Sequence, residues 1–85
     1  MVIGRKTEKN LKKLPRPIAE IAFALFEELE TEGPCQIEWP NYSKLENKKY
    51  HCHLTHHWVA CWEIKNQLLC ILEVYYVGSR ESAPY

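Results

Sequence analysis

Hydrophobic positions along the first half of the chain follow the period of an α-helix. Between residues 17 and 29, apolar side chains recur on one helix face, and Pro17 suits the first turn of that helix. Gly33 is expected to end it, because glycine readily adopts the left-handed conformation of a helix cap. A shorter, lysine-rich helix is expected to begin with Thr7 as its N-cap and to stop before Pro15, since proline disrupts helices. The pattern therefore predicts a hairpin of two helices, each with one packed face.

The second half of the chain has the patterns of β-strands. Residues 50–55 alternate between the two faces of a strand, and residues 58–64 form the next strand after a tight connection. A polar turn at residues 65–67 leads into residues 68–77, which are almost continuously apolar. Such a run indicates a central strand with both faces covered. Residues 2–3 are long enough only for a minimal edge strand.

These elements predict an α+β domain with the order β-α-α-β-β-β. A short N-terminal strand and the helical hairpin would pack on a small antiparallel β-sheet. Residues 35–47 are expected to form an irregular loop that ends in a turn. At 85 residues, of which 46% are hydrophobic, the chain has the size and composition of an ordered globular unit. We therefore expect a single domain spanning residues 1–85.

Hydropathy and cysteine spacing indicate the cellular location of the protein and the state of its cysteines. No apolar run approaches the roughly 18 residues that a membrane span needs, and the first residues lack the apolar core of a signal peptide. We therefore expect a cytoplasmic protein with no membrane partner. The four cysteines contain no CxxC pair, which argues against a zinc ribbon. Cys52, Cys61 and Cys70 are instead expected to be buried as small hydrophobic side chains.

Charge is unevenly distributed, although the formal net charge is zero. Residues 1–16 carry six basic side chains and one acidic one, whereas residues 17–33 carry five glutamates and no basic side chain. Such a pattern usually gives solvated charged faces, and it also allows one positive face to meet a polyanion.

All four histidines lie within residues 51–57, directly after Lys48, Lys49 and a tyrosine. Imidazole titrates between about pH 5 and 8, so this cluster indicates proton transfer, metal binding or anion recognition. Strand alternation places His51 and His53 on one face, about 7 Å apart, and leaves the other two histidines in a turn. This spacing suits two groups on either side of one phosphate. The HxH spacing also leaves open a small zinc-binding protein.

An ordered set of segments extends across the chain: Lys12-Lys13-Leu14-Pro15, the amphipathic helix, Lys44-Leu45 before the strands, and Val77-Gly78-Ser79-Arg80 close to Tyr85. This combination resembles toxins of the RelE/ParE superfamily, which belong to bacterial toxin–antitoxin pairs. The several histidines and a tryptophan that enters the next strand, as Trp58 does, resemble the YafQ-type subgroup. RelE-like members are ribosome-dependent mRNA endonucleases that need no metal, whereas ParE-like members inhibit DNA gyrase without chemistry of their own.

The resemblance implies a RelE-like fold and a set of functional residues. The catalytic residues would be His51, His53, Arg80 and Tyr85, with the histidines transferring protons and the arginine holding the phosphate. RNA would be positioned by Lys44, Lys48, Lys49, His57 and Trp58. The resemblance implies no cofactor. As partners it implies a cognate antitoxin, the ribosome and mRNA, with the toxin held in a toxin–antitoxin hetero-oligomer.

Two features keep the alternatives open. Val59 stands where RelE carries an arginine in the strand that follows the histidine positions. The net charge of zero is also low for a nuclease that binds the ribosome. A ParE-like inhibitor of DNA gyrase therefore remains a second hypothesis, and a protein that keeps the toxin fold without its activity is a third.

Overall fold

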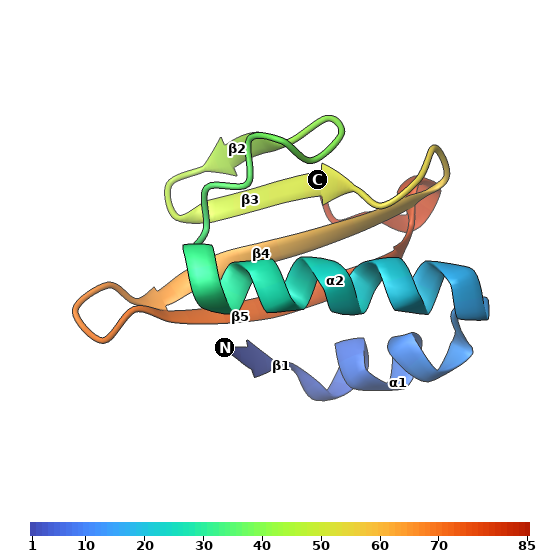
Figure 1. Cartoon of the computed structure of the whole chain (residues 1–85), viewed down its shortest axis with the longest axis horizontal. Coiled ribbons are helices and arrows are strands. Elements are labelled where there is room, and N and C mark those ends of the chain that lie inside the picture. The colour runs from blue at the N-terminus through green and yellow to red at the C-terminus, as the bar shows by residue number, and fades with distance from the viewer.

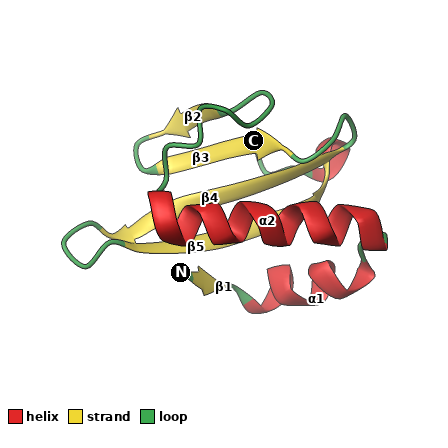
Figure 2. Ribbon diagram, viewed as in Figure 1, coloured by secondary structure: helices red, strands yellow, loops and turns green.

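Two helices and a five-stranded mixed sheet make up an α+β fold, in which the longer helix crosses one face of the sheet (Figure 1). The computed structural model describes all residues, 1–85. Figure 2 shows that short loops and turns join most of the elements. In chain order these are β1 (Val2–Ile3), α1 (Arg5–Lys13), α2 (Arg16–Glu32), β2 (Ser43–Glu46), β3 (Lys49–His53), β4 (Trp58–Asn66), β5 (Ile71–Ser79) and a 3-10 turn (Arg80–Ser82).

The sheet has the strand order β1-β5-β4-β3-β2, with β1 parallel to β5 and all other neighbours antiparallel. The prediction of an antiparallel sheet was therefore wrong for β1, which runs parallel to β5. The prediction of three strands after the helices was also wrong, because β2 lies within the segment expected to be a loop. Its side chains are mostly exposed, since β2 is an edge strand, so the sequence shows no apolar alternation there. Lys48, with φ of 69°, closes the turn from β2 to β3.

The helical hairpin forms as the apolar period predicts, with a shift at its start. Helix α1 begins at Arg5 rather than after Thr7, and the Thr7 side chain is buried in the first turn. Gly4 is the residue before α1, and its N–H donates to the Val74 carbonyl at 3.4 Å, which ties the helix start to β5. Helix α2 ends at Glu32, and Gly33 follows it with φ of 87° and ψ of −168°, so glycine ends the helix as expected but not in the left-handed helical conformation.

The core lies between α2 and the facing side of the sheet. Trp62 is fully buried at its centre, and its indole N–H donates to the Pro34 carbonyl at 3.1 Å, which holds the loop that follows α2. The rings of Tyr42 and Tyr50 stack with this indole at centroid separations of 6.2 to 6.3 Å. The buried members of the core are Ala22, Leu25, Phe26, Leu29, Tyr50, Cys52, Leu54, Ala60, Trp62, Leu72, Val74 and Val77.

The hairpin between β4 and β5 is longer than the sequence predicts. Strand β5 begins at Ile71, so the prediction of a strand from residue 68 was wrong at its start. Leu68 and Leu69 instead lie at the hairpin tip with 94% and 70% of their surface exposed. The turn is fixed by Asn66, whose side-chain oxygen accepts the Leu69 N–H at 2.9 Å. An apolar run cannot by itself tell a strand from an exposed turn of this kind.

Two of the four cysteines belong to the interior. Cys52 and Cys61 are fully buried, as expected, whereas Cys35 and Cys70 are exposed. The prediction was wrong for Cys70, because it lies in the hairpin turn with φ of 55°. Neither α1 nor α2 combines the length and apolarity that a membrane-crossing helix requires.

Replacing Leu25 with alanine should test the core directly. Leu25 has no exposed surface, so Leu25→Ala would leave a cavity beneath α2 and lower the free energy of unfolding by about 2–5 kcal/mol. Urea denaturation followed by tryptophan fluorescence measures this loss. The exposed Glu27 on the same helix serves as control, and Glu27→Ala should change stability by less than about 0.5 kcal/mol. Equal stability of the two variants would contradict the packing of α2.

Candidate functional site

The face of the sheet opposite α2 holds the histidine pair. His51 pairs in register with Cys61 and His53 with Val59, so all four side chains lie on this face. The two imidazole rings are 5.8 Å apart between centroids, close to the separation expected from strand geometry. Both are buried rather than open, with 8% and 9% of their surface exposed. The shared face is thus as the sequence predicts, but the rings are sheltered.

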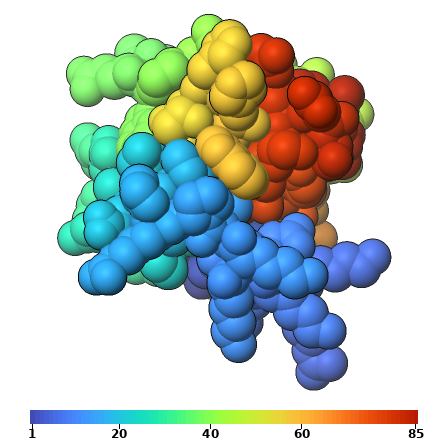
Figure 3. Space-filling model, turned by 90° about the vertical axis from the view of Figure 1, so that its right-hand side faces the viewer, coloured from blue at the N-terminus to red at the C-terminus, as the bar shows by residue number.

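The end of the chain covers this face. After the 3-10 turn the chain returns toward β3, where Figure 1 places the C-terminus. There the Tyr85 ring lies 4.5 Å from the His51 ring between centroids. Figure 3 shows the loop between β3 and β4 packed against the C-terminal segment, where the Arg80 N–H donates to the His57 carbonyl at 2.7 Å. The structure therefore brings the two ends of the predicted catalytic set together, with Tyr85 against His51.

One ring nitrogen of each histidine lies within hydrogen-bond distance of a polar side chain. Nδ1 of His53 lies 3.3 Å from the side-chain nitrogen of Asn41, which can only donate. Nδ1 therefore accepts and Nε2 of His53 carries the proton. Nδ1 of His51 lies 3.0 Å from Oγ of Ser43, a hydroxyl that can donate or accept. When Nδ1 donates to this oxygen, His51 keeps a free lone pair on Nε2.

Asn41 and Ser43 are site residues that reasoning from the sequence missed. Both lie in the segment expected to be a loop, so neither was paired with a histidine. The available signal was the hairpin register: Ser43 lies directly opposite His51 once β2 is recognised as a strand. Asn41 has φ of 52°, a conformation that asparagine tolerates better than most residues.

Burial sets the protonation of the cluster. It lowers the pKa of His51, and it lowers the pKa of His53 together with the nearby charges of His51, Arg80 and His56. Both imidazoles are therefore neutral at pH 7. Burial raises the pKa of Tyr85, although the Arg80 charge acts in the opposite direction, so the phenol keeps its proton. The effect of Arg80 on both His53 and Tyr85 places its charge near these two groups.

Cys61 is the cysteine that shares the face of the histidines, where it lies opposite His51. Burial raises the pKa of the Cys61 thiol to about 12, so it stays protonated at neutral pH. No three histidine, cysteine, aspartate or glutamate side chains are arranged so that they could hold a metal ion. The titratable side chains on this face are thus two imidazoles and a phenol, which are groups that can transfer protons.

The predicted RNA-binding lysines are scattered over the structure. The Lys44 ammonium lies over the Tyr50 ring at 5.8 Å from its centroid, on the side of the sheet that α2 covers. Lys48 is exposed in the turn before β3. Lys49 alone shares the face of His51, and there its ammonium is paired with glutamates of β2 and β4. These lysines and the histidines do not form one continuous basic surface.

The other two predicted RNA-binding residues lie at the end of the sheet near Arg80. His57 is exposed in the loop between β3 and β4, and its ring lies 4.8 Å from that of His56. Trp58 is half-buried against the core and also lines a hollow of about 300 Å³ together with Lys13 and Ser79. Of the two, His57 makes the backbone contact with Arg80.

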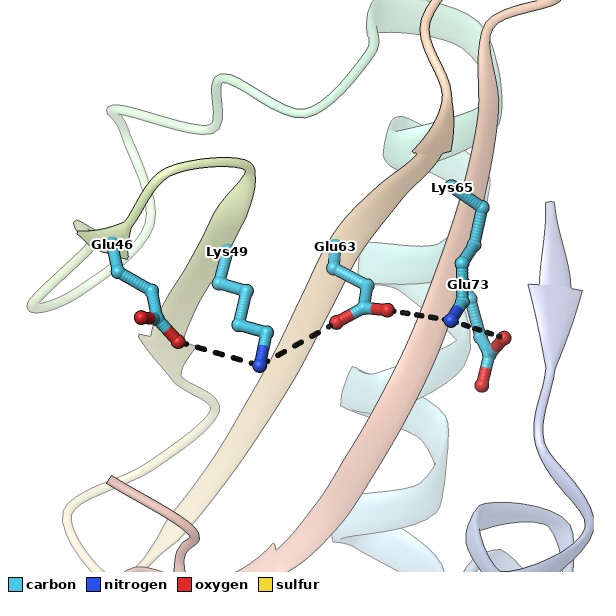
Figure 4. Close-up of polar contacts among 5 residues, drawn as sticks. All are labelled: Glu46, Lys49, Glu63, Lys65 and Glu73. Atoms are coloured by element: carbon cyan, nitrogen blue, oxygen red, sulfur yellow. Dashed lines mark ion pairs between the residues drawn. The ribbon is translucent and has the colours of Figure 1, made fainter.

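A chain of five ion-paired side chains crosses the other end of the same face (Figure 4). The Lys49 ammonium joins Glu46 at 3.3 Å and Glu63 at 3.9 Å, and the Lys65 ammonium joins Glu63 at 2.8 Å and Glu73 at 3.8 Å. Glu63 and Glu73 are direct cross-strand neighbours, so Lys65 offsets a repulsion between like charges. We call these five residues the ion-pair ladder.

Comparisons with known proteins found no match. No protein-family model fits the chain, and neither the curated protein sequences nor the solved structures contain a significantly similar protein. The function must therefore be argued from the site itself.

The lowered histidine pKa values predict a loss of stability in mild acid. In the unfolded chain histidine takes up a proton near pH 6.5, whereas folded His51 and His53 resist it. The unfolded state then binds more protons, so the free energy of unfolding is greatest above about pH 7 and falls as the pH drops through 6.5. Urea denaturation at several pH values between 5.5 and 8 measures this slope.

The control for this prediction uses the exposed pair in the neighbouring loop. His51→Asn combined with His53→Asn should flatten the pH dependence, whereas His56→Gln combined with His57→Gln should leave most of it. Asparagine is chosen because its amide can occupy the place of Nδ1 beside Ser43 and Asn41. An unchanged slope in the first double variant would show that other groups cause the pH dependence.

Proposed function

We propose that the protein is the toxin of a bacterial toxin–antitoxin pair and that it cleaves mRNA on the ribosome without a metal ion. The observation that carries the proposal is the meeting of His51, His53 and Tyr85, with the Arg80 charge beside them, on the face of the sheet that α2 leaves free. These residue types come from two distant parts of the chain. They supply a base, hydrogen-bond donors and a cation within one small area.

The proposed role of His51 uses the tautomer in which Nδ1 donates to Ser43 and Nε2 is free to accept a proton. In such a cleavage, Nε2 of His51 accepts the proton of the ribose 2′-hydroxyl, whose oxygen then attacks the adjacent phosphorus. The bond from phosphorus to the 5′-oxygen breaks, which leaves a 2′,3′-cyclic phosphate and a 5′-hydroxyl end. The departing oxygen takes the proton of the Tyr85 phenol, or a proton of His53 in those molecules in which its imidazole is protonated, since a neutral His53 would become an imidazolate.

Arg80 supplies the charge for this reaction. Its guanidinium can hold two non-bridging phosphate oxygens at once, and this contact strengthens as negative charge builds up in the transition state. No second cation supports it from β4, because the position beside His53 is Val59, which is fully buried. Lys49 is not a substitute, since the ion-pair ladder engages its ammonium. Arg80 therefore carries most of the proposed phosphate recognition.

The sheltered state of the histidines supports a need for partners. His51 lies under Tyr85, so RNA must displace this ring or stack on it before it reaches Nε2. Aromatic side chains stack on bases with about 1–3 kcal/mol per base, which is enough to favour such a rearrangement on an RNA that the ribosome presents. A cognate antitoxin in the cytoplasm would block the same face, and its complex with this chain would be the resting form.

Cleavage of a defined mRNA on purified bacterial ribosomes tests the proposal. The full chain should cut the message at the ribosomal A site and leave 5′-hydroxyl ends, and a 2′-O-methyl group at the cut nucleotide should prevent cleavage. His51→Asn should slow the reaction by about 10²–10⁴-fold, the range of general base catalysis, and His53→Asn by a similar factor if it is the acid. Arg80→Ala should do so as well. Primer extension and end labelling measure the products.

Lys65→Gln provides the matched control, because Lys65 lies on the same face but belongs to the ion-pair ladder rather than to the histidine cluster. This variant should cut at the wild-type rate. Full activity of the His51→Asn, His53→Asn double variant would overturn the assignment of the site. No cleavage by the wild-type chain would overturn the proposed nuclease activity and favour the hypothesis of a protein that lacks it.

One observation favours inhibition of DNA gyrase as a second candidate. The lysines predicted to bind RNA do not surround the histidine cluster, whereas a nucleic-acid track is normally lined by several cations. A supercoiling assay with purified gyrase separates the two functions. The nuclease predicts undisturbed supercoiling, and inhibition that persists in His51→Asn would favour a binding toxin.

A further inference from the structure

Apolar surface and negative charge meet at the C-terminal end of α2. A hollow of about 440 Å³ lies between this end and the hairpin that joins β4 and β5. Leu29, Ile64 and Leu72 provide its apolar lining, and Glu30 and Glu32 its acidic side. Figure 1 shows both elements at the same end of the molecule, away from the turn that joins the two helices. We call this hollow the α2–hairpin groove.

The surroundings of the groove are unusually apolar. Leu68 and Leu69 lie next in the chain to two of its lining residues, and 94% and 70% of their surface is exposed. A smaller hollow of about 150 Å³ shares Glu32 with the groove and is lined by Ile37, which is 78% exposed. Three of the six large hydrophobic residues that the surface exposes therefore lie at this end. Such a concentration marks an interaction surface more often than chance exposure.

The same end carries a negative charge that nothing in the chain offsets. Residues 17–43 contain six glutamates and no lysine or arginine. Only Glu20 among them forms an ion pair, with Arg16 at the opposite end of α2. The other five have no basic partner: Glu27, Glu28, Glu30, Glu32 and Glu38. All of these except Glu27 line the groove or its neighbouring hollow.

The placement of these glutamates acts against the helix itself. The C-terminal end of a helix carries partial negative charge and favours basic side chains, yet the last turn of α2 has none. A sequence that departs from the local rule without a gain in stability commonly does so at a functional surface. These charges therefore do not stabilise the end of the helix, and no basic side chain of the chain pairs with them.

We propose that the α2–hairpin groove binds a basic amphipathic helix of a partner protein. Its apolar side chains would enter between Leu29 and Leu72 and cover the leucines of the hairpin tip, and its lysines or arginines would face Glu30 and Glu32. The charge of the groove selects this occupant, because an acidic or neutral helix would leave Glu30 and Glu32 unpaired. This site is separate from the histidine face, and it does not depend on RNA cleavage.

Binding of a labelled model helix tests the proposal. The probe is a short fluorescein-labelled peptide of leucines and lysines in an amphipathic pattern, and the same pattern with glutamate in place of lysine is its counterpart. Fluorescence anisotropy with the full chain should show binding of the first peptide and none of the second. Glu30→Gln with Glu32→Gln should weaken binding about tenfold, as the loss of two ion pairs would. Leu68→Ser with Leu69→Ser should weaken it as well.

Glu8→Gln with Glu81→Gln removes the same charge from exposed positions outside the groove, and it should bind the peptide within twofold of wild type. Equal weakening by this control would overturn the proposal, because binding would then follow only the total charge. Equal affinity for the two peptides would overturn it too. Sedimentation should also show a monomer. An oligomer that dissociates when the groove is substituted would overturn the proposal, because a second copy of the chain, through its basic α1, would then occupy the groove.

Glu32→Lys separates a binding role from a folding role. A lysine here suits the end of the helix, so the midpoint of thermal unfolding should rise by about 1–4 °C while binding of the basic peptide falls. A lower midpoint would mean that the glutamate serves the fold, and the proposal would fail.

Discussion

The alternation of β3 is the constraint on which the rest of the structure depends. Five residues of one strand serve two opposite purposes, because successive side chains point to opposite faces. Tyr50 and Cys52 enter the core beneath α2, while His51 and His53 meet the end of the chain on the other side. A shift of register by one residue would exchange the two sets. The packing of Tyr50 against Trp62 therefore also holds the imidazoles in place.

The sequence was most informative where one physical rule acted alone. The period of α2 and its end at Gly33 could be predicted, and so could the common face of His51 and His53. Strand β2 could not, because an exposed edge strand has no need of apolar residues. The position of Tyr85 over His51 depends on the path of the chain after β5, which no local pattern records. The burial of the histidines follows from that path, so it was missed as well.

Charge is separated along the molecule as it is along the sequence. The basic α1 and the acidic end of α2 form no ion pair with each other, and the one pair within α2 lies at its start. The ion-pair ladder, by contrast, neutralises most of its own charges across β2, β3, β4 and β5. Some charged residues of this protein therefore join the strands of the sheet, while the glutamates at the C-terminal end of α2 have no basic partner in the chain.

The two edges of the sheet have a consequence for the behaviour of the protein at high concentration. Strand β1 has only two residues, because helix α1 begins directly after it. Strand β2 has four residues, with a break in register between Lys44 and Glu46. Short, bulged and charged edges offer few free backbone groups to the strands of another molecule. A chain at high concentration is thereby protected from adding strand to strand into aggregates.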